Sequence, residues 1–305
     1  MKTKLIISSL TIIILASSCQ NNQKDISDIT DSISADSVKS IVTDSTPAFQ
    51  FQAEQFADLR VLRYQVPGFE ELSLQQKTLI YYLYEAALCG RDILWDQNYK
   101  YNLTVRKTIE TIYDSYNGDR ASEEFKKFEV YSKRVWFSNG IHHHYSSDKI
   151  LPEFSKEYFT DLISKSNASG FPLANGETLV QFEQRISDIV FNPSLAPKKV
   201  NLDPKFDLVA SSAVNYYEGL TQKEAEGFYK DANKLNGKTP VMPGLNSKLI
   251  KENGKLVEKT WKLGGMYNSA IERIIFWLEK AVPFTENETQ KDALVKLINF
   301  YKSGS

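Results

Sequence analysis

The sequence is poor in the residues that build metal sites and disulfide scaffolds. Its 305 residues include two cysteines and three histidines, which excludes the zinc-finger and disulfide-rich classes. An excess of charge of either sign is also missing, since 37 Lys and Arg face 38 Asp and Glu. A nucleic-acid binder needs a net basic surface, so we expect no nucleic-acid partner. Aromatic residues, by contrast, make up 12% of the chain, which indicates a folded protein with a substantial core.

The first nineteen residues have the pattern of a targeting segment. Two lysines precede the apolar run 5–15, which is too short to span a bilayer comfortably. The run ends in Leu15-Ala16-Ser17-Ser18-Cys19, which resembles a bacterial lipobox with small residues before a cysteine. We predict a lipoprotein signal peptide at 1–19, lipid attachment at Cys19, and a lipid-anchored protein of the cell envelope, at the outer membrane or the periplasmic face. The alternative is an ordinary secretory signal that contains a cysteine.

Residues 20–47 have the composition of a solvated segment. They include five Asp and two Lys, many Ser and Thr, and no aromatic residue. Such a segment cannot bury enough apolar surface to offset the entropy of ordering it. We predict a disordered tether at 20–47 and one folded domain at 48–305. Cys89 is the remaining thiol after lipidation, and its apolar neighbours favour a small core residue over a reactive thiol.

The folded part is predominantly helical by pattern, with a small β component, so we predict an α+β fold. Apolar spacing and capping signals such as Ser73-x-x-Gln76 and Thr221-x-x-Glu224 mark helix starts. Asn253-Gly254 lies between two alternating runs, a pattern typical of a tight β-hairpin. The predicted helices cover 73–95, 105–118, 122–139, 155–166, 177–190, 221–235, 267–281 and 287–302, with a proline-containing loop at 191–207 and the hairpin at 248–261.

No catalytic constellation can be identified from the residues. The histidines are adjacent, at His142, His143 and His144, and neither a strand nor a helix would align all three toward one metal ion. A zinc site needs three or four converging ligands, so we favour a structured loop over a metal site and predict no metal in this chain. The H-E-x-x-H, G-x-S-x-G and P-loop motifs are all missing from the sequence.

Several stretches resemble the N-terminal part of dipeptidyl peptidase III, a zinc metallopeptidase family, in its Bacteroidetes-type branch. The likeness covers about residues 50–305. The similar stretches are Phe56 to Gly68, Leu79 to Ala87 with Gly90 to Ile93, Tyr131 to Pro152, Tyr216 to Ala225, and Tyr301 to Ser305.

The resemblance implies half of a two-lobed enzyme that releases N-terminal dipeptides from oligopeptides. In the family, the lower lobe, to which this chain corresponds, consists of helices around a β-barrel. The other lobe carries zinc on an H-E-x-x-G-H helix. That motif does not occur in this sequence. We therefore expect an incomplete barrel with an exposed strand edge, no cofactor in this chain, and no activity by the chain alone. A split or truncated product would need a zinc-bearing second lobe as its partner.

The resemblance also implies a substrate-binding position. In the family, an aromatic residue in the loop after the helix-ending turn lines the peptide cleft, and Tyr145 occupies that position here. His144 and Asn139 are its neighbours in the sequence. The alternative is that Tyr145 only packs its own loop. For the whole chain, the alternatives are a stand-alone lipoprotein that binds peptides or a protein, and an assembly artefact with no separate role.

Overall fold

The computed structural model describes residues 49–234 and 244–305, and the folded unit spans Gln50–Ser305. The proposed lipid-attachment residue Cys19 and the tether at 20–47 lie outside the described residues. The elements are β1 (Gln52–Phe56), β2 (Leu59–Leu62), η1 (Phe69–Glu71), α1 (Leu74–Cys89), α2 (Arg91–Asn98), α3 (Asn102–Ser115), α4 (Glu123–Ser138), α5 (Lys156–Ser164), η2 (Ala168–Gly170), α6 (Leu179–Phe191), β3 (Tyr217–Glu218), α7 (Gln222–Lys234), β4 (Ser247–Glu252), β5 (Lys255–Thr260), α8 (Asn268–Ala281), η3 (Val282–Phe284) and α9 (Glu288–Ser303).

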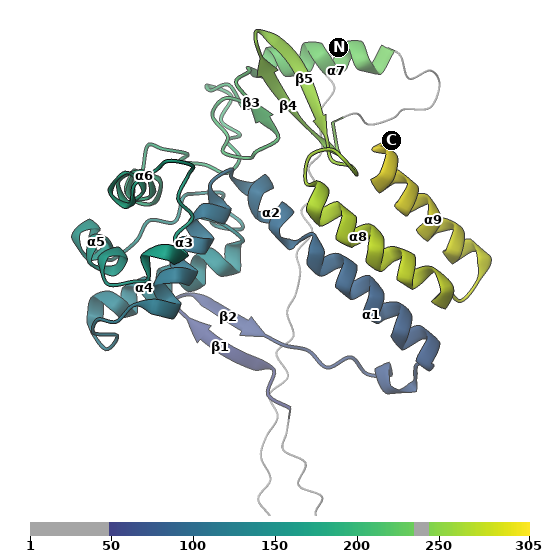
Figure 1. Ribbon diagram of the computed structural model, residues 1–305, viewed down its shortest axis with the longest axis horizontal. Coiled ribbons are helices and arrows are strands. Elements are labelled where there is room, and N and C mark those ends of the chain that lie inside the picture. The colour runs from purple at the N-terminus through teal and green to yellow at the C-terminus, as the bar shows by residue number, and fades with distance from the viewer. Residues whose placement is uncertain (1–48, 235–243) are drawn as a thin grey trace, which may run out of the picture. The chain divides into compact units, whose positions relative to one another are not determined.

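The predicted α+β class with predominant helices is confirmed (Figure 1). Helices α3 to α6 enclose the largest core, which is rich in aromatic rings. Phe125, Phe128 and Phe182 are almost fully buried there, and Phe154 makes edge-to-face contacts with Phe128 and Tyr131. Such ring pairs add to the stabilisation by buried area. In the part of the chain that the structure describes, no helix is both long and apolar enough to cross a membrane.

A second core joins the beginning of the folded unit to its end. Helix α1 packs against α8, and α9 lies beside α8 (Figure 1). The buried residues of α8 recur at helical spacing as Ile271, Ile274, Ile275 and Leu278. Cys89, at the end of α1, is a free thiol that packs half-buried against this core, which agrees with the role expected for it.

The predicted single helix over 73–95 is wrong in one respect, because two helices occupy this segment. The Ser73–Gln76 capping box is present at the start of α1, but α1 ends at Cys89. The N–H of Gly90 donates to the carbonyl of Ala87 at 3.0 Å, a tight turn of the kind that often ends a helix. Helix α2 then begins at Arg91. This break lies against the side chain of Ile274 on α8.

Two small sheets make up the β component, and neither closes into a barrel within the described residues. Strands β1 and β2 form an antiparallel hairpin that the sequence patterns did not predict. In the other sheet, β4 lies between β3, which is parallel to it, and β5, which is antiparallel. The predicted hairpin is confirmed, since Asn253 and Gly254 both have positive φ, 50° and 76°, as a type I′ turn requires.

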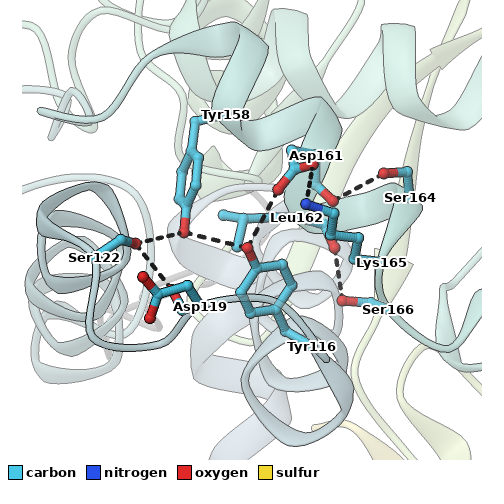
Figure 2. Close-up of polar contacts among 9 residues, drawn as sticks. All are labelled: Tyr116, Asp119, Ser122, Tyr158, Asp161, Leu162, Ser164, Lys165 and Ser166. Atoms are coloured by element: carbon cyan, nitrogen blue, oxygen red, sulfur yellow. Dashed lines mark hydrogen bonds and ion pairs between the residues drawn. The ribbon is translucent and has the colours of Figure 1, made fainter.

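A polar network ties α3, α4 and α5 together (Figure 2). The hydroxyl of Tyr116 donates to the Asp161 carboxylate at 3.2 Å, and it lies 3.5 Å from the hydroxyl of Tyr158. Ser122, which caps α4, lies 3.3 Å from the same Tyr158 hydroxyl. Burial raises the pKa of Tyr116 above its ordinary value, and its bond to Tyr158 adds to the shift. Because Tyr116 therefore stays neutral, we assign this network a structural role.

Two glycine substitutions should have opposite effects on stability. At Gly254, φ is +76° and a Cβ would meet no atom within 4 Å, so Gly254→Ala adds backbone strain without a clash. We expect a loss of about 1 kcal/mol in the free energy of unfolding. Gly227 lies exposed within α7, and Gly227→Ala should instead stabilise by up to about 1 kcal/mol. Urea unfolding of both variants checks this. If both substitutions changed the free energy of unfolding in the same direction, the assigned turn would be contradicted.

Candidate functional site

The segment that carries the histidines begins at a rigid helix end. Helix α4 stops at Asn139, whose φ of 51° is left-handed, and the N–H of Gly140 donates to the Val135 carbonyl at 3.0 Å. This is the pattern of a glycine-assisted helix end, and it agrees with the predicted end of the helix 122–139. Gly140 has a φ of +147°, and a Cβ there would lie 2.2 Å from Nδ2 of Asn102. The close approach of Asn102 therefore requires glycine at this position.

Asn102 is the fixed point for this segment. Its side chain has no exposure to solvent, and its Nδ2 donates to the carbonyl of Trp95 at 3.1 Å. Its Oδ1 accepts a bond of 3.1 Å from the N–H of Ile141. Since a buried amide is costly unless it is hydrogen-bonded, this double contact holds the chain after Gly140 against the start of α3.

His142 is a core residue. Only 1% of its surface is exposed, its ring lies edge-on to Tyr99, and its Nε2 lies 2.8 Å from the carbonyl of Ala196. A carbonyl only accepts, so Nε2 carries the proton, and the buried Nδ1 has no partner. Burial lowers the pKa of His142 to about 4, with nearby Lys149 and Lys199 acting in the same direction. This histidine is neutral at physiological pH.

The next three residues form a compact turn. The Nδ1 of His143 accepts hydrogen bonds from the N–H groups of Tyr145 and Ser146, each at 3.2 Å. The ring of His144 stacks on that of His143 with 4.4 Å between centroids, and it also contacts Phe137 and Tyr145. Tyr145 is 87% exposed. The turn closes where the N–H of His143 donates to the Asp148 carbonyl at 2.7 Å.

Tyr145 lies at one edge of an open groove of about 1190 Å³. A strip of three backbone segments lines this groove. In the strip, segment 197–199 lies between segments 147–149 and 213–214. The bonds of the strip run from Lys149 N to Pro197 O, Lys199 N to Ser147 O, Ala213 N to Lys198 O and Val214 N to Lys199 O. The strip fixes the position of this side of the groove. It is not a regular sheet, although Asp148 and Lys198 form an isolated β-bridge within it.

The groove presents aromatic and aliphatic side chains to solvent. Leu202 is 78% exposed and Phe206 is 57% exposed, and both come from the proline-containing segment 191–207. That segment was correctly predicted as a loop. Lys149 holds its beginning in place by donating to the carbonyls of Asn192 and Leu195 at 2.6 and 2.9 Å. Burial lowers the pKa of Lys149 to about 8. The lining side chains of this kind include Tyr101, Tyr145, Val200, Leu202, Phe206, Val209 and Tyr217.

The charged groups of the groove are largely paired. Glu218 accepts from Lys248 and lies 3.5 Å from Lys100, and Lys198 pairs with Asp148. The hydroxyls of Ser211 and Ser212 donate to backbone carbonyls at 2.6 Å, so they are engaged in the turn. Neither histidine nor cysteine lines the groove. The lining therefore offers surface for binding rather than a nucleophile with an adjacent base.

The histidine segment does not form a donor set for a metal ion. The Nε2 of His142 is bonded to a carbonyl, and the Nδ1 of His143 is bonded to backbone N–H groups. Within 49–234 and 244–305, no three side chains of His, Cys, Asp or Glu are grouped to hold a metal. The residues described thus do not fit the zinc that the family resemblance implies.

Comparison with known proteins finds 11 similar chains among the solved structures. No family model matches the sequence, and no curated protein matches it. The structure is similar to that of DPP III from Caldithrix abyssi. The TM-score is 0.45 with 18% sequence identity, over 78% of this chain and 32% of that one. The chain spans about a third of the length of that solved structure.

The three predicted site residues occupy three different positions relative to the groove. Tyr145 lines the groove. His144 does not line the groove, but its ring contacts that of Tyr145 with 4.6 Å between the two ring centroids. Asn139 is the end of α4 and accepts from Nδ2 of Asn98 through its backbone carbonyl, and it is not among the groove residues. Sequence reasoning missed Leu202 and Phe206, although apolar residues in an irregular, proline-containing segment are a usable signal for an exposed binding surface.

The depressed pKa of His142 makes stability depend on pH. The unfolded chain binds a proton near pH 6.5, whereas the folded chain binds it only near pH 4. The contribution is complete above pH 6.5 and is lost as the pH falls through this window. We expect the free energy of unfolding to fall by about 2 kcal/mol between about pH 7 and about pH 5.

His142→Gln tests this, because an amide can donate to the Ala196 carbonyl but does not titrate. Urea unfolding at both pH values should show a clearly smaller loss in the variant than in the unaltered chain. Parallel losses in the two proteins would show that another group is responsible.

Proposed function

We propose that this chain is the substrate-binding lobe of a lipid-anchored, dipeptidyl peptidase III-like enzyme and that its groove binds extended oligopeptides. The observation that carries the proposal is the position of Tyr145. The family resemblance assigns this residue to a peptide cleft, and in the structure it lies at the edge of the open groove.

The chemistry of the groove supports a peptide as its ligand. Exposed Tyr145, Leu202 and Phe206 offer apolar surface to side chains, and the irregular strip beside them contributes backbone groups. A lining of apolar and aromatic groups with a few polar ones is typical of ligand sites. Because the charged groups are mostly paired with one another, we expect a preference for peptides with aromatic or aliphatic side chains.

Catalysis requires a second lobe in this proposal. The described residues hold no donor set for zinc, so the metal and the general base would come from a zinc-bearing partner. Strand β5 pairs with β4 and with no other strand among the described residues, which leaves an edge that further strands could extend into the barrel expected from the family. The chain alone would bind peptides without cleaving them.

The anchor is a separate element of the proposal. The lipobox at Cys19 supports attachment to an envelope membrane, with 20–47 as the tether. A stand-alone peptide- or protein-binding lipoprotein is the second candidate function. It is favoured by the exposed stripe Ile80, Tyr84 and Leu88 on α1, since apolar side chains four residues apart form one face that a protein partner could cover.

Removing the Tyr145 ring should weaken peptide binding. We expect Tyr145→Ala to lower the affinity of the purified full chain for pentapeptides rich in Tyr and Leu by roughly fivefold, the loss of one aromatic contact. Tyr64→Ala is the matched control, because Tyr64 is also exposed, at 75%, and does not line the groove. Isothermal titration calorimetry measures both variants.

Two results would contradict the proposal. The groove assignment fails if the unaltered chain binds no pentapeptide, or if both tyrosine variants lose affinity equally. The two-lobe assignment fails if the full chain alone releases dipeptides at a zinc-dependent rate.

A further inference from the structure

The turn 143–148 depends on one particular tautomer of His143. Both groups that contact its Nδ1 are backbone N–H groups, which can only donate. Nδ1 must therefore be unprotonated, and the single proton of the neutral ring is on Nε2. A second proton would convert this acceptor into a donor facing two donors. Both hydrogen bonds to Tyr145 and Ser146 would then be lost.

The surroundings add to the cost of a charged ring. The ring of His144 is stacked 4.4 Å away, and two imidazolium rings at that separation repel each other. Burial lowers the pKa of His144, and His143 and Lys199 lower it further. The charged groups around the two rings are largely paired with one another. Lys127 on α4 pairs with Glu124, Arg134 on α4 with Asp58, and Lys198 with Asp148, while Lys149, Glu153 and Lys199 also lie nearby.

We propose that the turn 143–148 is a pH-sensitive element, in which protonation of His143 releases the N–H groups of Tyr145 and Ser146 and moves Tyr145 from the edge of the groove. Two other hydrogen bonds close the turn, from His143 N to Asp148 O and from Ser147 N to His143 O. Neither involves the imidazole. The turn therefore loosens locally, and the buried strip below it stays in place.

This inference rests in part on the proposed function, because Tyr145 is its peptide-contacting residue. The release of the turn regulates the groove: peptides bind at neutral pH and leave at acidic pH. Histidine is the side chain whose ordinary titration lies in that range. His142 does not take part, since it is buried and bonded to Ala196.

Nuclear magnetic resonance on the full chain tests the turn directly. With three histidines in the sequence, a sample labelled with ¹⁵N-histidine and ¹⁵N-tyrosine gives few signals. At about pH 7.5 we expect an unprotonated Nδ1 on His143, and on acidification to about pH 5 its titration should coincide with a shift of the Tyr145 amide signal. Pentapeptide affinity, measured by calorimetry on the same samples, should weaken roughly fivefold over this range.

Two variants separate the roles of the neighbouring rings. In His143→Asn, the amide oxygen can accept from the N–H two residues later, as in an Asx turn, and does not titrate. This variant should hold Tyr145 in place at both pH values. His144→Asn leaves the contacts of His143 intact and should keep the response.

The outcomes distinguish the failure of the pH-sensitive turn from the failure of the proposed peptide-binding function. A Tyr145 amide signal that ignores the titration of His143, or a response retained in His143→Asn, overturns the pH-sensitive turn. A response lost in His144→Asn assigns the effect to His144 and also overturns it. If the turn responds as expected but no pentapeptide binds at either pH, the proposed function fails while the turn stands.

Discussion

The buried carboxamide of Asn102 is the contact on which the groove region depends. It joins the end of α2, through Trp95, to the chain after α4, through Ile141. It also requires glycine at position 140, since any larger residue would meet the amide. Everything that follows, from the buried His142 to the exposed Tyr145, takes its position from this anchored start. A buried amide with both ends bonded specifies one arrangement, because any shift leaves a costly unpaired group.

Three adjacent histidines behave as three different residues because of their surroundings. The first is held neutral in the core by burial and a carbonyl partner. The second accepts two backbone bonds that define the turn. The third stacks between its neighbours and Phe137. Composition alone suggests a metal-binding tract. In the structure His142 is buried, whereas His143 and His144 are half-buried, so the three rings are divided between the core and the turn 143–148.

The sequence predicted most helices and the β4–β5 hairpin because these elements carry strong local signals. Capping boxes at Ser73 and Thr221 and the Asn253-Gly254 turn each satisfy a backbone requirement within a few residues. The β1–β2 hairpin was missed since its turn uses Ala57 at a positive φ of 47°, with neither glycine nor asparagine to mark it. Its position depends on distant contacts, such as Phe56 on Phe137 and Arg134 with Asp58.

The candidate site was predictable only at Tyr145. The groove depends on hydrogen bonds between segments about 50 and 15 residues apart along the chain, which leave no periodic pattern. Leu202 and Phe206 are exposed, so the rules that identify core residues do not select them.

The packing of α1 on α8 has a consequence for biosynthesis. The two helices begin almost two hundred residues apart, at Leu74 and Asn268, so α1 is complete long before its partner leaves the ribosome. Until then Ala86 and its half-buried neighbours Leu83 and Cys89 have no surface to cover them, and closing so long a segment is entropically costly and slow. The nascent polypeptide therefore carries a helix with uncovered apolar side chains through most of its elongation, which is the kind of segment that chaperones recognise.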